Sequence, residues 1–243
     1  MILTTAVIKG GTGKSSTAAA LLQAAAHSGK RCLAIDTDPQ SNLTFFLSAD
    51  NDRPGSYELL HGQEVQEVLQ STAQDIDVIA GSPDLATEVT KPGSSSRLKK
   101  AIAPIKENYD LIIIDTPPQM GELTYNALMA AEGLLIPLEA DNSSLQGLYN
   151  ITDIAQQVQK ANPDLQILGS VITRYDARPK LNRYLPDVIR DTGAEIGAPL
   201  LMSIRQAVAV KEAQAMQESL YKYAPRCKAA QDYKELLQIV YKC

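Results

Sequence analysis

The stretch "VIKGGTGKSS", Val7 to Ser16, decides how the rest of this 243-residue chain is interpreted. It follows the apolar, β-branched segment "ILTTAVI", which is typical of a strand, and precedes an Ala- and Leu-rich segment, 18–26, that is typical of a helix ended by Gly29. Glycines between a strand and a helix let the backbone curl so that successive N–H groups point at one spot, where they bind phosphate. The stretch therefore predicts a phosphate-binding loop.

This loop departs from the general pattern at one position and carries an extra lysine. The pattern GxxxxGK[ST] has glycine where this chain has Ile8. Lys14 is placed to neutralise the β- and γ-phosphates, and the Ser15 hydroxyl to bind Mg²⁺. Lys9 stands at the mouth of the loop, where it either reaches outward or is simply solvated. The predicted nucleotide-binding residues are Lys9, Gly10, Gly11, Thr12, Gly13, Lys14, Ser15 and Ser16, together with the acidic residues Asp36 and Asp115.

Two acidic motifs follow other strand-like segments. Asp115 comes after four apolar residues in "LIIIDTPP", so we expect a Walker B carboxylate that holds Mg²⁺ through water, or else a carboxylate that caps the next turn. Asp36 and Asp38 in "AIDTDPQSN" alternate on an extended segment, so both can lie at the sheet edge where open α/β sheets bind ligands. One could organise the magnesium shell and the other orient the attacking water; alternatively, both cap the helix that begins near Asn42. The predicted metal ligands are Ser15, Asp38 and Asp115, and the predicted catalytic residues are Lys9, Lys14 and Asp38.

Short apolar runs alternate with longer helical patterns along the whole chain. Strands separated by helices predict a mostly parallel, twisted sheet covered by helices on both faces, and the length favours one α/β domain over residues 1–243. The last segment, 226–242, has apolar residues at helical spacing and reads either as a helix docked on the domain or as a helix lying on a membrane. Because its polar face is not rich in Lys or Arg, we expect a docked helix and no membrane anchor. The other expected strands are "RCLAID", "DIDVIAG", "YDLIIID", "EGLLIPLE", "LQILGSVIT" and "APLLMSI".

Charge and cysteine content exclude some function classes. The net charge of −5 argues against a protein that coats nucleic acid through its overall charge. Residues 174–228 hold ten Lys/Arg against six Asp/Glu, so this segment has a net charge of +4 and the rest of the chain has −9. Any DNA contacts would therefore have to come from this segment. The alternative is that it forms only a solvated basic face. The three cysteines show no CxxC spacing, and the start of the chain has no signal-peptide pattern, so we expect no metal–sulfur site and a cytosolic protein. The candidate DNA-contacting residues are Arg174, Arg178, Lys180, Arg183, Arg205 and Lys211.

The three motifs together resemble one known family. "KGGTGKSS", "DTDPQSN" and "IIIDTPPQMGELTYNALMAAEGLLIPLEADNSSLQGL" are similar to the ParA/MinD family of deviant Walker A ATPases, most closely to the ParA branch that segregates plasmids and chromosomes. The tail "SIRQAVAVKEAQAMQESLYKYAPRCKAAQDYKEL" resembles the same branch, so the similarity covers nearly the whole chain. Members often lack glycine at the position of Ile8.

The resemblance implies a single-domain P-loop NTPase that hydrolyses ATP to ADP and phosphate with Mg²⁺. It implies that Lys9 crosses to the ATP of a second subunit in a sandwich dimer, that Asp38 is the switch I acid needed for hydrolysis, that Asp36 orders the site, and that Asp115 begins switch II at 115–118. It further implies slow hydrolysis stimulated by a ParB-like centromere-binding protein, nonspecific DNA binding by the ATP-bound dimer, and a cytoplasmic, nucleoid-associated protein. Loops 173–176 and 203–205 lie where relatives contact the adenine base.

Other functions on the same fold remain as alternatives. A MinD-like or orphan ParA-like ATPase would position a membrane or protein cargo. Electron-transfer ATPases such as the nitrogenase iron protein need cysteine ligands near switch II, and residues 77–141 contain no cysteine. A biosynthetic ligase or small-molecule kinase would need a substrate pocket, for which we find no sequence signature.

Overall fold

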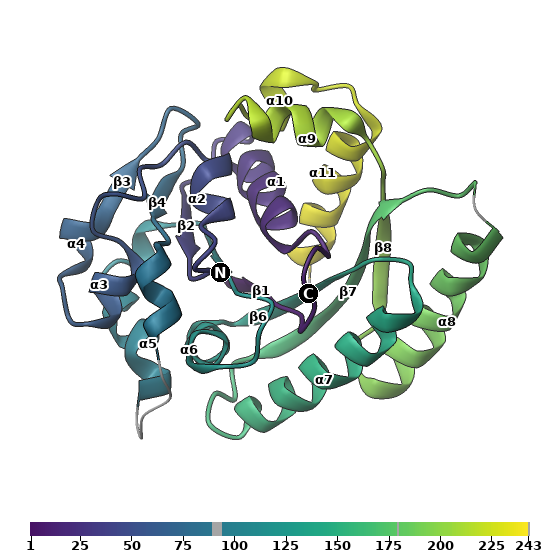
Figure 1. The fold of residues 1–243 in the computed structure, drawn as a ribbon, viewed down its shortest axis with the longest axis horizontal. Coiled ribbons are helices and arrows are strands. Elements are labelled where there is room, and N and C mark those ends of the chain that lie inside the picture. The colour runs from purple at the N-terminus through teal and green to yellow at the C-terminus, as the bar shows by residue number, and fades with distance from the viewer. Residues whose placement is uncertain (89–93, 179, 243) are drawn as a thin grey trace.

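One sheet runs through the whole molecule, and helices cover both of its faces (Figure 1). The computed structural model describes residues 1–88, 94–178 and 180–242. In this part of the chain the sheet has eight strands in the order β3-β4-β2-β5-β1-β6-β7-β8. The strands are β1 (Ile2–Thr5), β2 (Cys32–Asp36), β3 (Leu69–Ser71), β4 (Asp77–Ile79), β5 (Leu111–Asp115), β6 (Gly133–Leu138), β7 (Gln166–Tyr175) and β8 (Leu200–Arg205).

All neighbouring strands are parallel except the edge pair, in which β3 runs antiparallel to β4. The predicted fold class is therefore confirmed, and each of the seven expected strand segments contains a strand. The strand β3 was not expected, because three residues are too few to show a pattern. The helices are α1 (Lys14–His27), α2 (Asn42–Phe46), α3 (Ser56–Leu60), α4 (Val65–Val68), α5 (Arg97–Ile102), α6 (Glu122–Ala130), α7 (Asn142–Gln159), α8 (Lys180–Ile196), α9 (Val208–Ala215), α10 (Leu220–Tyr223) and α11 (Lys228–Val240), with 3₁₀ turns η1 (Pro83–Thr87), η2 (Ser94–Ser96) and η3 (Lys106–Asn108).

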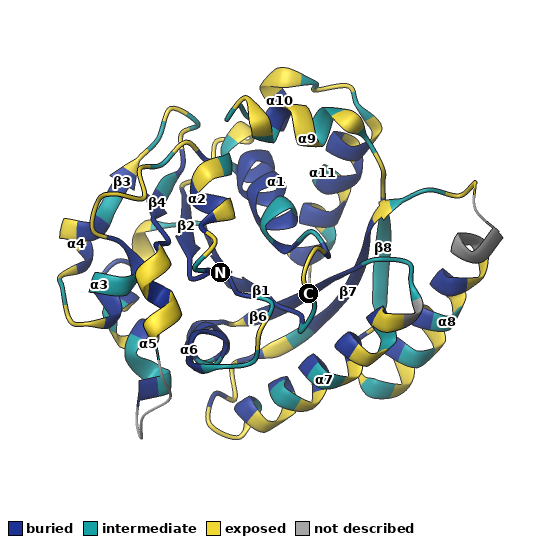
Figure 2. Ribbon diagram, viewed as in Figure 1, coloured by how far each residue is buried: buried dark blue, intermediate teal, exposed yellow. Residues whose placement is uncertain are grey.

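The central strand β5 explains why "LIII" is apolar without alternation. Ile113 packs into the cluster formed with α1 and α11, whereas Ile112 and Ile114 pack into the cluster formed with α3, α5 and α6 on the other face. All three isoleucines are buried, and the interior between sheet and helices is buried throughout (Figure 2). A strand covered on both faces needs apolar residues at every position.

The C-terminal helix α11 is docked, as expected. Ala229, Leu236 and Val240 are fully buried in the cluster that includes α1, so the apolar face of the helix lies inside the domain. The same face is not available to lie on a membrane surface. Among the described residues, none of the helices combines the length and apolarity that a bilayer span needs.

We predict that Leu236→Ala lowers the free energy of unfolding by about 2–5 kcal/mol, because it opens a cavity at a fully buried position. Gln238, exposed on the same helix, provides the control: Gln238→Ala should change stability by less than about 0.5 kcal/mol. Urea denaturation followed by circular dichroism measures both. Equal stabilities for the two variants would show that α11 is not docked as described.

Candidate functional site

The predicted phosphate-binding loop joins β1 to the N-terminus of α1. The helix begins at Lys14, so its free N–H groups face the loop. Gly13 has φ 87°, and a Cβ there would lie 3.2 Å from Oγ1 of Thr173 on β7, so both the backbone and the space require glycine. The loop is thus held in a fixed curl against the end of β7.

Lys14 is buried beneath the loop, and its Nζ donates a hydrogen bond to the Lys9 carbonyl over 3.2 Å. Burial lowers the pKa of Lys14, while the negative charges of Asp115 and Asp38 act in the opposite direction. The ammonium therefore sits in a dehydrated setting between the loop and the acidic motifs, where its charge acts strongly on any anion in the loop.

Asp36 and Asp115 lie opposite each other on the neighbouring strands β2 and β5, and both are fully buried. Burial, reinforced by the negative charge of Asp36, raises the pKa of Asp115 to about 7; Ser15, Lys14 and Thr5 act in the opposite direction. Burial likewise raises the pKa of Asp36 to about 6. Thr5 donates to Oδ1 of Asp115 over 3.0 Å, whereas Oδ2 is buried without a hydrogen-bond partner in the described part of the chain.

The two acids of the second motif have different surroundings. Both carboxylate oxygens of Asp36 are occupied, because Oδ1 accepts from the Asp38 N–H and Oδ2 accepts from the N–H and hydroxyl of Thr44 on α2. Asp36 therefore fixes the start of α2 rather than facing a ligand. Asp38 lines the cavity in front of the loop, and burial raises its pKa, opposed by the Gln40 N–H and by Lys14.

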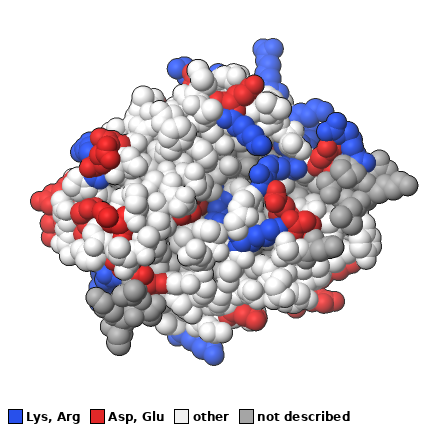
Figure 3. Space-filling view, viewed as in Figure 1, with Lys and Arg blue, Asp and Glu red and all other residues white. Residues whose placement is uncertain are grey.

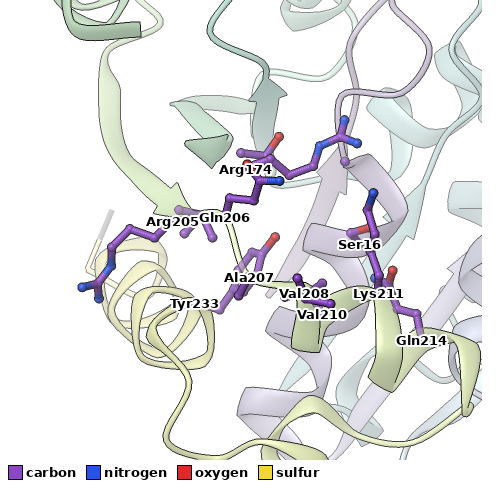
Figure 4. Close-up of a pocket in the computed structure, with 13 residues that line it drawn as sticks. Ser16, Arg174, Arg205, Gln206, Ala207, Val208, Val210, Lys211, Gln214 and Tyr233 are labelled. Carbon is purple, nitrogen blue, oxygen red and sulfur yellow. The ribbon is translucent and has the colours of Figure 1, made fainter. Parts of the chain in front are cut away.

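Two adjoining cavities open from the loop. The first, of about 340 Å³, lies in front of residues 10–16 and Asp38; the second, of about 230 Å³, lies between β7, β8 and α9 (Figure 4). They share Gly13, Ser16 and Arg174. The two segments expected to contact the adenine base, 173–176 and 203–205, lie at the ends of β7 and β8 and not in separate loops. They reach the second cavity through Thr173 and Arg174 and through Ile204 and Arg205.

Sequence reasoning missed much of this lining. The wall residues that it did not assign to the site are Gln40, Asn42 and Phe46 in the first cavity and Gln206, Ala207, Val208, Val210, Gln214 and Tyr233 in the second; Pro118, also in the first cavity, ends the expected switch II segment. None of these residue types marks a cavity by itself, and Tyr233 appeared only as an apolar position of α11. Lys9, Asp36 and Asp115 do not line either cavity.

Lys9 points to a partner that the sequence did not suggest. Its Nζ contacts Oδ2 of Asp141, the N-cap of α7, and lies 3.4 Å from the Ser144 hydroxyl. Lys9 holds the pKa of Asp141 below its usual value, together with Ser143 and Ser144, while burial acts against them. In the single chain, the ammonium group of Lys9 is thus held at the mouth of the loop by the same molecule.

Three candidate DNA-contacting arginines form ion pairs within the chain. Arg174 pairs with Glu139 over 2.5 Å and Arg178 with the nearby Asp176 over 2.7 Å. The guanidinium of Arg205 is directed away from the second cavity and pairs with Asp232 of α11 over 2.5 Å (Figure 4).

Of the remaining DNA candidates, Lys211 lines the second cavity, and no ion pair involves it in the described ranges. Lys180 and Arg183 belong to α8, but their side chains lie outside the described part of the structure. Basic side chains gather on the right-hand half of the face in Figure 3, with acidic side chains among them. The local excess of positive charge is therefore partly compensated.

Comparison with known proteins agrees with this geometry. The family model AAA_31, an AAA domain, matches residues 1–167. The chromosome-partitioning ATPase Soj of Thermus thermophilus is 34% identical over 235 residues, which cover 96% of this chain and 92% of that protein. The chain belongs to the ParA/MinD-type ATPases of this family. The resemblance seen in the motifs is confirmed, and the chain is an ATPase.

Other relatives extend the agreement over the whole length. The sporulation initiation inhibitor protein Soj of Bacillus subtilis is 34% identical over 249 residues, covering 96% of this chain and 94% of that protein. A solved structure of Mycobacterium smegmatis cobyrinic acid a,c-diamide synthase with ADP and magnesium has a TM-score of 0.84 at 30% identity, covering 99% of this chain and 94% of that one. The similarity of this ParA/MinD-type ATPase to these proteins thus extends beyond the phosphate-binding loop and covers nearly the whole chain.

The buried carboxyl pair predicts a pH dependence of the nucleotide-free protein. The folded-state pKa of Asp115 is about 7, above the unfolded value of about 3.9, so the unfolded chain loses this proton first as pH rises. The contribution of Asp115 to stability is therefore present below pH ~4, is lost between pH ~4 and pH ~7, and stays level above. We expect the unfolding free energy of wild type minus that of Asp115→Asn to fall across this window, as measured by urea denaturation. A difference that is independent of pH would contradict the raised pKa.

Proposed function

We propose that this ParA/MinD-type ATPase is a partition ATPase: Mg-ATP joins two copies, the joined copies hold DNA without sequence preference, and partner-stimulated hydrolysis releases them. The observation that carries the proposal is the place of Lys9, at the mouth of the phosphate loop and outside both cavities. A lysine that lines neither cavity of its own chain can serve the nucleotide of a second copy once it leaves Asp141. Residues 1–243 act in this proposal as one domain.

The residues of the first cavity fit a triphosphate. The N–H groups of the loop and of the first turn of α1 bind the phosphates together with Lys14, and the second cavity takes the adenine and ribose. Mg²⁺ would be held by Ser15 directly and by Asp38 and Asp115 through water; the orphan Oδ2 of Asp115 fits this role. The ion supplies positive charge to the phosphate oxygens.

Hydrolysis then depends on two further groups of the chain. Asp38, at the cavity wall, orients the attacking water, and Lys14 stabilises the negative charge that develops on the phosphates. Asp36 keeps Asp38 in place through the Asp38 N–H and through Thr44. This division of roles assigns positioning to Asp36, which does not line the cavity, and water activation to Asp38, which does.

Lys9 makes association depend on nucleotide. Each charge-assisted bond to phosphate contributes about 1.5–3 kcal/mol, and two-fold symmetry forms it twice, which gives about 3–6 kcal/mol, or a factor of about 10² to 10⁴ in dimer affinity. The free energy of the contact between Lys9 and Asp141 must be subtracted from this gain, because Lys9 has to leave Asp141 to reach the second copy. Asp141 is thus a competitor for the lysine in the single chain.

We predict that Lys9→Ala binds ATP but forms no ATP-dependent dimers in sedimentation velocity. Asp141→Asn retains an N-cap residue for α7 and weakens the hold on Lys9, so it should form dimers at lower protein concentration than wild type. Lys14→Ala is the control that should lose ATP binding itself. Wild-type dimerisation by Lys9→Ala would remove Lys9 from this role.

In this proposal, DNA binding depends on dimerisation, because the DNA-binding surface of each single copy has a low affinity. Nonspecific DNA binding typically has a Kd of about 10⁻⁴ to 10⁻⁶ M, and a single acidic chain with partly paired arginines should bind feebly. Two copies held together bind far better through effective concentration. Of the three candidate arginines, Arg178 carries the most exposed side chain, at 89%, against 42% for Arg174 and 45% for Arg205, so it is the best placed of the three to contact phosphate.

We predict that Asp38→Ala with Mg-ATP shifts plasmid DNA in a gel, that the affinity falls steeply with salt, and that the ADP form gives no shift. Adding Arg178→Ala, at an exposed residue that lines neither cavity, should weaken this binding without changing dimerisation. Equal binding by both nucleotide forms, or no binding by either, would end the DNA part of the proposal.

The setting of this cycle is the cytoplasm, at the nucleoid, with a ParB-like centromere-binding protein as partner. Support comes from the Soj relatives that match over 96% of the chain. The likeness to a diamide synthase favours a second candidate, a biosynthetic ligase, which would require an acid substrate beside the phosphates. Hydrolysis of ATP with DNA and partner as the only additions would favour partition; a strict need for an added small acid would favour the ligase. Positioning of a membrane or protein cargo is the further alternative within the family.

A further inference from the structure

A third cavity lies beside the phosphate site. It has a volume of about 460 Å³ and is formed by the loop after β2, by η1, and by the segment from Pro117 to the start of α6. Asp38, Gln40 and Pro118 line both this cavity and the phosphate cavity. Anything that occupies the third cavity therefore touches the residues that would surround the terminal phosphate.

The charged side chains at the described walls of this cavity are all acidic: Asp38, Glu88 and Glu122. Glu88 is already balanced, because it contacts Arg97 and lies 3.3 Å from Nε2 of His61. The negative charge of Asp38 is partly balanced by the nearby positive charge of Lys14. For Glu122 there is no ion pair anywhere in the described ranges.

Glu122 is the first residue of α6 and only 2% exposed. Its Oε1 accepts a hydrogen bond from Nδ2 of Asn126 over 2.8 Å, but Oε2 is buried without a partner in the described structure. A buried carboxylate with an unsatisfied oxygen is costly, and a cation brought from outside removes that cost. The remaining wall includes Leu85, Pro117 and Leu123, which suit the methylene stem of a long basic side chain.

We propose that this cavity receives an arginine or lysine side chain of a partner protein, with Oε2 of Glu122 as its acceptor. The inference rests on the proposed function in one respect, namely that the partner acts on the ATP site. A basic segment fits better than a neutral one because the unbalanced charge of the wall is negative. A second copy is a poorer occupant, because in the proposed dimer it already offers Lys9 to the phosphates.

The test uses a fluorescein-labelled peptide of alternating glycine and arginine, and its binding to the full chain is followed by fluorescence anisotropy. Glu122→Gln keeps the acceptor for Asn126 but removes the charge. Glu67→Gln, on the exposed face of α4, is the control with the same net charge. We expect Glu122→Gln to bind the peptide at least about tenfold more weakly than Glu67→Gln, as the loss of one charge-assisted hydrogen bond predicts.

A second variant keeps the test decisive if Glu122→Gln is poorly folded. Ala86 on η1 is exposed and lines the cavity, so Ala86→Arg places a guanidinium at its mouth and should block the peptide. Equal peptide affinity in all variants would overturn the proposal. It would also be overturned if Glu122→Gln lost ATP-driven dimers but bound the peptide as before, because a second copy would then be the occupant of the cavity. ATP binding by the same preparations is measured separately: its failure in wild type would refute the proposed function, whereas the peptide result judges the cavity alone.

Discussion

Two carboxyl groups buried side by side are the constraint on which the site depends. Asp36 and Asp115 meet because β2 and β5 are parallel neighbours in register, and neither is accessible to solvent. Around them the surrounding segments supply donors: Thr5 of β1 to Asp115, and Thr44 of α2 to Asp36. These hydrogen bonds link β2 and β5 to α2 and to β1, the strand that leads into the phosphate-binding loop. The positions of Lys14 and Asp38 follow from these links.

Much of the fold and the centre of the site could be predicted from sequence, since their signals are local. A strand, a glycine loop and a helix follow one another within residues 2–27, and Asp36, Asp38 and Asp115 each follow an apolar run. Contacts between residues that are far apart in the sequence could not be predicted, because no local sequence pattern marks them. Asp141, which holds Lys9, is 132 residues away from it, and η1, Gln40 and Pro118 form the third cavity only after folding.

The number of charged residues in a segment does not show which of them are available to bind DNA. The excess of Lys and Arg in residues 174–228 made Arg205 a candidate for DNA, yet its guanidinium is bonded to Asp232, which is only 7% exposed. A backbone bond from the Arg205 N–H to the same carboxylate strengthens the link between β8 and α11. Composition cannot tell an arginine that joins two elements from one that faces solvent, because both contribute the same unit of charge.

The contact between Lys9 and Asp141 has a consequence for the evolution of the resting protein. It links the start of the loop to the N-cap of α7, so any change that tightens the contact stabilises the single chain. In the proposed dimer, the same change would withhold the ammonium group from the second copy. Under that proposal, heat stability and readiness to assemble are opposed at this one pair, and selection for heat tolerance here would raise the ATP concentration at which two copies begin to associate.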